Sequence, residues 1–426
     1  MGDESDTDMA HTLEGVPEGF VTRRPAESFI SDLSQQYQQS QWSYHYAGRV
    51  VTVEQLETDP HPTLAAIRPI GWIEALNTWM VTSRALVLKV LRDPETFTVD
   101  DPRFSTAQVV GPSMLSLDGA GHKAHRDPFE SPFTLAETRR RFVGPVQQTV
   151  DELMAAFQSD RAGVAPAADL RTALAGPLSV AVVALSLGLP PASASTVLDW
   201  YTAISASVSG VSAGHPVTAE GAAAFGELHK HVAAGIDSSD SLIAAAAQAG
   251  LGVDEVVANA AVLMFGGIET TEGMITNALW HLLTNRDQLD LVLADPTLLP
   301  NAMEESLRLE PAAAVVDRYA TRDIELAGAQ IRRGDMVTVS LAGAGRDPEM
   351  FESPDTFDVR RPNARRHLAF ASGPHICLGM HLTRLETLTA LEAVLQLPGL
   401  RLAADSPAPR GLVFRKPSAL RVSWDA

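Results

Sequence analysis

The only cysteine of this 426-residue chain, Cys377, lies in the segment Phe370-Ala-Ser-Gly-Pro-His-Ile-Cys-Leu-Gly379. A helical pattern follows directly, with leucines at 382, 385, 388 and 391. We therefore expect Cys377 at a helix N-terminus, where the dipole and unpaired N–H groups lower the pKa of a thiol and can donate to its sulfur. A lone cysteine is more often a packed core residue, but this neighbourhood favours a thiolate that binds a metal.

The residues around Cys377 indicate what the thiolate would hold. Gly373 permits a sharp turn, Gly379 leaves room for a flat macrocycle, and Phe370 can pack over the loop. A single cysteine excludes intrachain disulfides and cysteine-based zinc or iron–sulfur cages. The rival interpretation is a zinc site formed by His375 and Cys377, which lacks the further ligands that zinc requires.

A second segment with chemical potential is Gly266-Gly-Ile-Glu-Thr-Thr271, within a predicted helix near residues 253–284. The paired Gly266 and Gly267 weaken the backbone ladder, and small hydroxyl side chains can fill it, so we expect a kink or a widened turn. Taken alone, this pattern is typical of an ordinary helix defect.

The elements that position these residues are mainly helical. An Ala- and Leu-rich pattern with 3.6-residue spacing predicts a helical bundle over about 115–310 and 378–396. Residues 1–25 are expected to form a flexible tail. No Pro/Ser-rich linker divides the remainder, so we expect a single domain over 26–426.

Minor β regions are expected at about 45–85, 319–342 and 411–424. Alternating residues predict strands at 77–82, 324–326 and 336–340, and a final strand pair within 411–424. The Gly/Ser-rich segment 207–216 predicts a break between two helices, either an ordinary loop or a mobile lid.

Charge and hydropathy exclude several classes of function. A net charge of −19 argues against nucleic-acid binding, which depends on neutralising phosphates with Lys and Arg. Apolar stretches are interrupted well before about 20 residues, and the first residues are acidic, unlike a secretory leader. We therefore expect a cytoplasmic protein without a membrane anchor.

The segment around Cys377 resembles the cysteine-ligand signature of the cytochrome P-450 family, Phe-x-x-Gly-x-His/Arg-x-Cys-x-Gly. The signature is highly specific, and the resemblance covers about residues 70–426. It departs at Ala371, where the family usually has glycine, a small replacement that does not weaken the resemblance. The resemblance implies a mainly α fold with small β-sheets, shaped as a triangular prism with a long central helix over the haem.

The same resemblance assigns roles to residues far from the cysteine. Haem b would be the cofactor, with Cys377 as axial ligand and Phe370, Gly373, His375, Gly379, Gly266 and Gly267 beside it. Glu269 and Thr270 match the acid–alcohol pair that routes protons to reduced dioxygen. His122, Arg126, Arg318 and His367 match positions that bind the haem carboxylates, although singly each would be a surface charge or a core histidine.

Glu305 and Arg308 stand three residues apart on one predicted helix face, by itself a commonplace ion pair. In the family this pair is buried and completed by a downstream arginine, matched here by Arg361. The resemblance implies that the triad supports the ligand loop and has no catalytic part.

The implied activity is monooxygenation, the insertion of one atom of O2 into a hydrophobic small molecule by hydroxylation, dealkylation or epoxidation. Electrons would come from a separate ferredoxin and its reductase, because the chain has no room for a flavin or iron–sulfur module. A basic patch facing an acidic ferredoxin is expected, or else an ordinary solvated set of charges, from Lys123, Arg139, Arg140, Arg141, Arg360, Arg361, Arg365 and Arg366.

Two other functions remain as alternatives. A peroxide-driven peroxygenase would not need the pair formed by Glu269 and Thr270, and a haem sensor would not need a proton relay over an open site. The matched pocket segments are small and apolar, so we expect a roomy hydrophobic pocket, free of charge at 311–316 and 418–419. The sequence does not specify the substrate, its regiochemistry, the native redox partners, the oligomeric state or the source organism.

Overall fold

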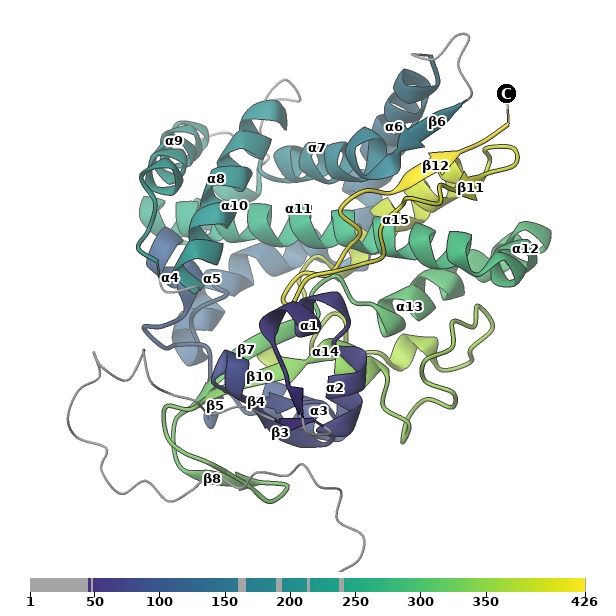
Figure 1. The fold of residues 1–426 in the computed structure, drawn as a ribbon. Helices are drawn as coiled ribbons and strands as arrows, with labels where there is room; N and C mark the ends of the chain where they lie inside the picture. Colours follow the sequence, from purple (N-terminus) through teal and green to yellow (C-terminus); the bar gives the residue numbers. More distant parts are fainter. Residues whose placement is uncertain are drawn as a thin grey trace, which may run out of the picture.

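A long helix, α11 (Val253–Thr284), crosses the middle of the molecule, and other helices pack around it (Figure 1). The structure is a computed structural model that describes residues 45–46, 49–159, 166–188, 194–212, 215–236 and 241–425. The expected tail at 1–25 lies outside the described residues. Most side chains of α11 are buried, as expected for a helix that is apolar on most faces.

The helical part confirms the predicted class, mainly α with small sheets. The remaining helices are α1 (Val53–Thr58), α2 (His61–Ala66), α3 (Arg84–Leu91), α4 (Ser105–Val110), α5 (Gly119–Glu130), α6 (Leu135–Ser159), α7 (Gly176–Ser186), α8 (Ala194–Ser212), α9 (Ala219–Gly235), α10 (Leu242–Gln248), α12 (Arg286–Ala294), α13 (Leu299–Leu309), α14 (Leu341–Gly345) and α15 (Met380–Val394). A π-helical turn at Arg171–Ala175 precedes α7. No helix in the described part of the chain is long and apolar enough to cross a membrane.

The largest sheet has the strand order β3-β4-β10-β7-β5. Its strands are β3 (Ile70–Ile73), β4 (Thr78–Val81), β5 (Phe97–Thr98), β7 (Val315–Ala320) and β10 (Met336–Ser340). β10 runs parallel to β4, with Val337 opposite Trp79, and antiparallel to β7, with Val337 opposite Arg318. Strand β7, which carries Arg318, thus belongs to the sheet that lies beneath the helical part (Figure 1).

Three smaller sheets complete the described fold. They are formed by β1 (His45–Tyr46) with β2 (Arg49–Val50), by β8 (Ile324–Leu326) with β9 (Ala329–Ile331), and by β11 (Arg401–Leu402), β12 (Arg421–Ser423) and β6 (Ala167–Asp169). β8 and β10 have the predicted bounds, and β4 lies within the predicted 77–82.

Three local predictions differ from the structure. The C-terminal strand β12 pairs with β11 and β6 and not with a second strand inside 411–424. The region 45–85 contains α1 and α2 as well as strands. The break expected from residue 207 begins later, because α8 continues to Ser212, and Ser207 and Val208 are buried in the helical packing.

Candidate functional site

Cys377 lies in a short loop between a 3-10 turn at Gly373–His375 and the start of α15 at Met380. Its backbone N–H donates to the carbonyl of Phe370 over 2.9 Å, which closes the loop. Gly373 has a φ of +77°, and a Cβ there would lie 2.4 Å from the carbonyl oxygen of Leu91. The loop therefore requires glycine at this position, both for its backbone conformation and for its close approach to α3.

The environment of the Cys377 thiol differs from the prediction. The side chain is exposed at the surface of its loop, yet enough protein surrounds it for desolvation to raise the pKa of the thiol. The N–H of Gly379 and the charges of Arg126 and Arg384 act in the opposite direction. Desolvation outweighs these contributions, so a bound cation would supply the remaining stabilisation that a thiolate needs.

Ala371 occupies the one position where the loop departs from the family signature. Its φ is +57°, in the left-handed region, and its N–H donates to the carbonyl of Leu368 over 2.8 Å. A residue with a Cβ is strained in this conformation by about 1–2 kcal/mol. The resemblance to the signature does not depend on this position, and alanine here adds a local strain of the backbone.

Several of the predicted cationic residues meet beside this loop. Arg126 donates to the carbonyl of Ile376 over 2.8 Å, and the rings of His122 and His375 are 4.2 Å apart. His375 Nε2 bonds to Asp118 over 2.8 Å, and the negative charge of Asp118 also favours the charged form of Arg318. The structure therefore brings four predicted residues together around an acidic residue that sequence reasoning missed.

Within this group, the environment of His122 indicates an anionic ligand most directly. Its side chain is buried, and its Nε2 atom has no hydrogen-bond partner among the described residues. Desolvation, followed by the charges of His375 and Arg126, lowers the pKa of His122 to about 4. A buried, unpaired ring nitrogen is costly, and an anionic ligand would satisfy it.

His367 lies in a different cluster. Its Nε2 bonds to Glu304 over 2.9 Å, and its Nδ1 accepts the N–H of Ala369 over 3.1 Å. Glu304 also receives two hydrogen bonds from Arg384, at 2.7 and 3.0 Å. Both ring nitrogens of His367 are thus engaged, and the residue is not brought together with His122. Arg384, seven residues after Cys377, stands over the ring of Phe370 at 4.4 Å.

The triad of Glu305, Arg308 and Arg361 is assembled in the core. Arg308 makes two bonds to Glu305, at 2.7 and 2.8 Å, and Arg361 bonds to it over 2.8 Å. The arginines also donate to loop carbonyls, including that of Pro354 from Arg308 and that of Glu352 from Arg361, each over 2.6 Å. The buried Glu305 carboxylate is therefore shared by two guanidinium groups, whose remaining donors hold the segment that leads to the ligand loop.

The backbone of the glycine-rich segment in α11 differs from the prediction. Its α-helical pattern is unbroken over Val253–Thr284, so the expected widened turn is not found. Thr270 instead donates from its hydroxyl to the carbonyl of Gly266 over 2.5 Å. Gly266 is exposed, with open space where a Cβ would stand, whereas a Cβ at Gly267 would lie 2.6 Å from Val183 of α7. Gly267 therefore serves helix packing.

Glu269 and Thr270 do not contact each other. Glu269 accepts a hydrogen bond from Tyr201 and pairs with Lys416 over 2.7 Å. The two members of the predicted acid–alcohol pair thus have separate partners.

The chemistry of the region fits a flat macrocycle with two carboxylates. Helix α15, which follows the cysteine loop, is linked to the central helix by a 2.7 Å hydrogen bond between Thr271 and Thr383. Gly379 and Gly266 both have open space where a Cβ would stand. The unpaired nitrogen of His122 and the guanidinium of Arg126 supply donors for anions. No cluster of three or more His, Cys, Asp or Glu suited to a metal ion is found among the described residues.

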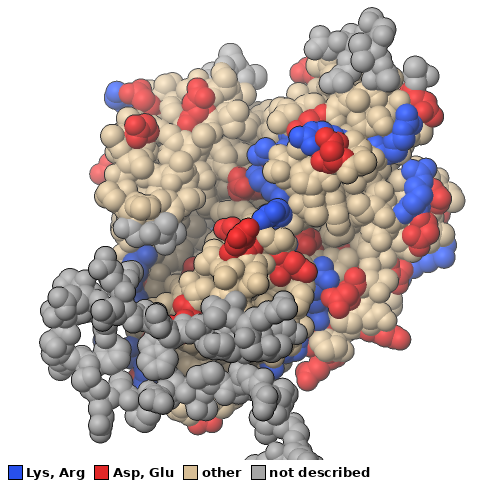
Figure 2. Space-filling model, viewed as in Figure 1, with Lys and Arg blue, Asp and Glu red and all other residues tan. Residues whose placement is uncertain are grey.

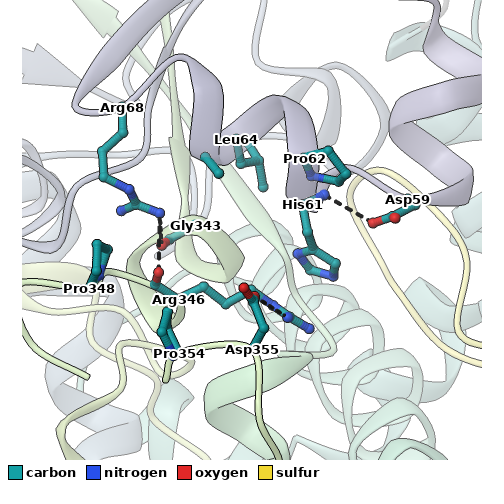
Figure 3. A pocket seen from close by; sticks show the side chains of 11 residues that line it. Asp59, His61, Pro62, Leu64, Arg68, Gly343, Arg346, Pro348, Pro354 and Asp355 are labelled. Carbon is teal, nitrogen blue, oxygen red and sulfur yellow. Dashed lines mark hydrogen bonds and ion pairs between the residues drawn. The ribbon is translucent and has the colours of Figure 1, made fainter. Parts of the chain in front are cut away.

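A separate pocket of about 580 Å³ lies between α2 and residues 343–355 (Figure 3). Arg68 donates there to the carbonyls of Thr82 and Gly343 over 2.7 and 3.0 Å. Arg346 pairs with Asp355 over 2.7 Å. The two arginines are therefore engaged within the chain, and the pocket contains no predicted site residue.

Comparison with known proteins agrees with this geometry. A family model described as cytochrome P-450 matches residues 231–400. The chain is 32% identical to the cytochrome P-450 monooxygenase PikC of Streptomyces venezuelae, over 86% of this chain and 91% of PikC. It is 33% identical to nocardicin C N-oxygenase of Nocardia uniformis subsp. tsuyamanensis, over 82% and 90% of the two chains. The crystal structure of CalO2 is similar with a TM-score of 0.77 and 29% identity, covering 86% of this chain and 96% of CalO2.

Proposed function

The chain belongs to the cytochrome P-450 family of haem-thiolate proteins, and from this premise we propose a haem b monooxygenase that hydroxylates a hydrophobic small molecule. Its relatives are monooxygenases, so the chain is an oxidoreductase that incorporates oxygen from O2. In the proposed reaction, R–H, O2, two electrons and two protons give R–OH and water. Dealkylation or epoxidation would follow where the substrate presents a different bond.

The observation that carries the proposal is the Cys377 loop beside an unpaired, buried His122. Cys377 would bind the iron, and the haem would supply the activation of O2 and the insertion of oxygen. Gly379 and Gly266 would accommodate the macrocycle. His122 and Arg126 would bind its carboxylates.

Two further residues would help to bind the carboxylates. His375 is held in place by Asp118, and Arg318 is buried and donates to the carbonyl of Asp317 over 2.7 Å. His367 is a weaker candidate because both of its nitrogens are engaged. Asp118 would fix the orientation of His375 and partly balance the positive charge of the group.

Proton delivery is proposed for Glu269 and Thr270. Thr270 holds a hydroxyl proton at Oγ1, which it donates to the carbonyl of Gly266. Glu269 is a part-buried carboxylate beside the phenol of Tyr201 and the ammonium of Lys416. Proton transfer by positioned groups of this kind contributes about 10²–10⁴-fold to rate.

The substrate is proposed to be a hydrophobic small molecule. Relatives include vitamin D3 dihydroxylase of Streptomyces griseolus and pentalenic acid synthase of Streptomyces avermitilis, whose names give small organic molecules. A role in secondary metabolism agrees with relatives such as the 20-oxo-5-O-mycaminosyltylactone 23-monooxygenase of Streptomyces fradiae. The cytoplasm, where thiols stay reduced, suits a protein that depends on one free cysteine.

Electrons are proposed to come from a ferredoxin and its reductase, docking on arginines near the cysteine loop. Arg92 bonds to Ser372 over 3.0 Å, and Arg84 bonds to the carbonyl of Arg366 over 2.9 Å. After desolvation, the positive charges of Arg366 and Arg92 lower the pKa of Arg84. The three arginines thus lie close enough together to form a locally basic surface, which favours an acidic partner.

The expected basic patch changes in composition. Arg361 is buried in the triad, while Lys123 and Arg140 pair with Asp127 and Glu137. Arg139 is exposed. Desolvation, followed by the charges of Arg384 and Arg139, lowers the pKa of His381 on α15. The face seen in Figure 2 mixes acidic and basic side chains among the described residues, without a continuous area of one sign.

The first experiment is the carbon monoxide spectrum of the dithionite-reduced protein. We expect the red-shifted Soret band that thiolate ligation produces, and its loss in Cys377→Ala. An unshifted band in the wild-type protein, or no haem from cells supplied with its precursors, would overturn the proposal.

A further inference from the structure

The C-terminal loop, residues 411–420, lies against one face of α11 (Figure 1). Phe414 packs edge-on against Phe265, with ring centroids 5.4 Å apart. Further along α11, the Asn277 amide donates to the carbonyl of Arg415 over 2.9 Å. The contacting positions of α11 recur at close intervals and share one face of the helix, namely 265, 269, 272, 273 and 277.

Lys416 makes the polar contacts at the centre of this face. Its ammonium lies 2.7 Å from Glu269 and 3.0 Å from Glu272, and its side chain is only 13% exposed. Arg171 also pairs with Glu272, and Tyr201 donates to the second oxygen of Glu269. Two carboxylates are thus balanced by two cations in a largely desolvated cluster, where each partner matters more than in a surface ion pair.

The backbone of Lys416 is held by its neighbour. Arg415 is 2% exposed and bonds to Glu310 over 2.5 Å. The same guanidinium donates to the carbonyls of Gly411 and Glu57 over 2.7 and 2.9 Å. Lys416 is therefore presented to α11 from a rigid loop, unlike a mobile surface lysine.

Thr270 follows Glu269 directly in the sequence, but its side chain leaves the helix in a different direction. Successive residues of an α-helix are about 100° apart, so the faces of Glu269 and Thr270 diverge. Thr270 bonds to Gly266, which is exposed, and not to the loop. The carboxylate that is proposed to deliver protons is therefore held by the loop about 100° around the helix from the alcohol.

We propose that Lys416 is a positioning residue for proton delivery, which, together with Tyr201, holds the Glu269 carboxylate on the loop face of α11. The inference rests on the proposed function. A Glu269 carboxylate that is held in place controls when protons reach the reduced oxygen. The O2 and the two electrons that are consumed then yield hydroxylated product and water. Without Lys416, Glu269 stands beside Glu272 with one cation fewer. More of the reduced O2 then leaves with two protons as hydrogen peroxide.

The test compares Lys416→Met with Lys416→Arg, which keeps the charge. The matched control is Lys230→Met, which breaks an exposed pair with Glu227 on α9. Product and peroxide are measured per NADH consumed, in the haem-loaded protein with a ferredoxin system and a hydrophobic small molecule selected because it shifts the haem spin state. Lys416→Met should lower the ratio of product to peroxide by about tenfold, Lys416→Arg should restore most of it, and Lys230→Met should leave it unchanged.

Glu269→Gln separates positioning from a structural role. In that background, Lys416→Met should cause no further loss in the ratio, since both changes act through one carboxylate. Melting temperatures of the haem-loaded wild type, the two single variants and the double variant give a readout without turnover, and the two changes should again be less than additive. Additive effects in either measurement, or a wild-type ratio in Lys416→Met, would overturn the inference.

The carbon monoxide spectrum distinguishes this failure from failure of the proposed function. A red-shifted band in every variant with an unchanged product ratio refutes the role of Lys416 alone. Absence of that band from the wild-type protein refutes the haem-thiolate function, while the melting temperatures still show whether Lys416 and Glu269 are coupled.

Discussion

Replacing His122 by glutamine should make the haem-free protein more resistant to acid. His122 is buried with an unpaired Nε2, and the fold lowers its pKa from an ordinary 6.5 to about 4. The unfolded chain therefore binds a proton at His122 between these pH values, whereas the folded chain does not. The contribution of neutral His122 to the free energy of unfolding is fully present above pH 6.5 and is lost as the pH falls from 6.5 towards 4. Glutamine does not titrate, so the variant does not show this loss.

The size of the effect follows from the two pKa values. At pH 5 the full shift would cost about 2 kcal/mol, and solvent screening reduces this to about 1 kcal/mol. We would measure urea unfolding at pH 5 and pH 8 for haem-free wild type and His122→Gln. His215→Gln is the matched control, since His215 is exposed. The gain of the variant should appear at pH 5 only.

The haem-loaded protein supplies the decisive comparison. A haem carboxylate beside His122 would favour its protonated form and cancel much of the penalty, so the gain at pH 5 should shrink on loading. The same gain with and without haem would refute the assignment of His122 to a haem carboxylate. No gain in the haem-free protein would refute the desolvation argument itself.

Three further predictions concern the loop, its support and its partner. Ala371→Gly should stabilise the protein by about 0.5–1 kcal/mol in thermal unfolding, because it relieves a positive φ. Ala155→Gly, at an exposed position of α6, should destabilise it by about as much. Changes in stability of the same sign for both variants would contradict the strain argument. Glu305→Gln should cost about 3–5 kcal/mol because it leaves two buried guanidinium groups without their anion, and denaturant unfolding that shows under about 1 kcal/mol would disprove this. Arg139→Glu with Arg366→Glu should slow ferredoxin-driven reduction severalfold at low salt and little at high salt, measured by stopped flow with Arg401→Glu as control; salt-independent rates would exclude the basic surface.

The residues that could be predicted from the sequence are those whose function depends on local spacing. The turn at Gly373, the loop carrying Cys377 and the pair of Glu305 and Arg308 all arise from residues close together in the chain. Local spacing also favoured the start of α15 and the strand β10. Such features depend on backbone conformation and helix geometry, which short segments largely determine.

The residues that were missed act through long-range contacts. Asp118 meets His375, and Glu304 meets Arg384, across 257 and 80 residues of sequence. Lys416 had no sequence signal, because its partners are known only once the C-terminal loop is placed on α11. The thiol of Cys377 shows the same limit: the helix dipole can be inferred from a motif, but the desolvation that exceeds it depends on the whole fold.

Helix α8 shows how packing overrides composition. The Ser- and Gly-rich residues from 207 suggested a break, yet small side chains also allow helices to approach closely. A Cβ at Gly221 of α9 would lie 2.5 Å from the Cβ of Ser207, so the two helices touch where both residues are small. The small residues that indicated a break are therefore part of an interhelical contact.

The separation of Glu269 from Thr270 follows from helix geometry and bears on how the site works. Adjacent residues in a motif suggest a pair, but positions i and i+1 of a helix do not face each other. Here Thr270 turns to Gly266, while Glu269 joins Tyr201 and Lys416. A proton that moves between the two side chains must therefore cross by a side-chain rotation or a bridging water, and the contacts that restrain Glu269 become part of its chemistry.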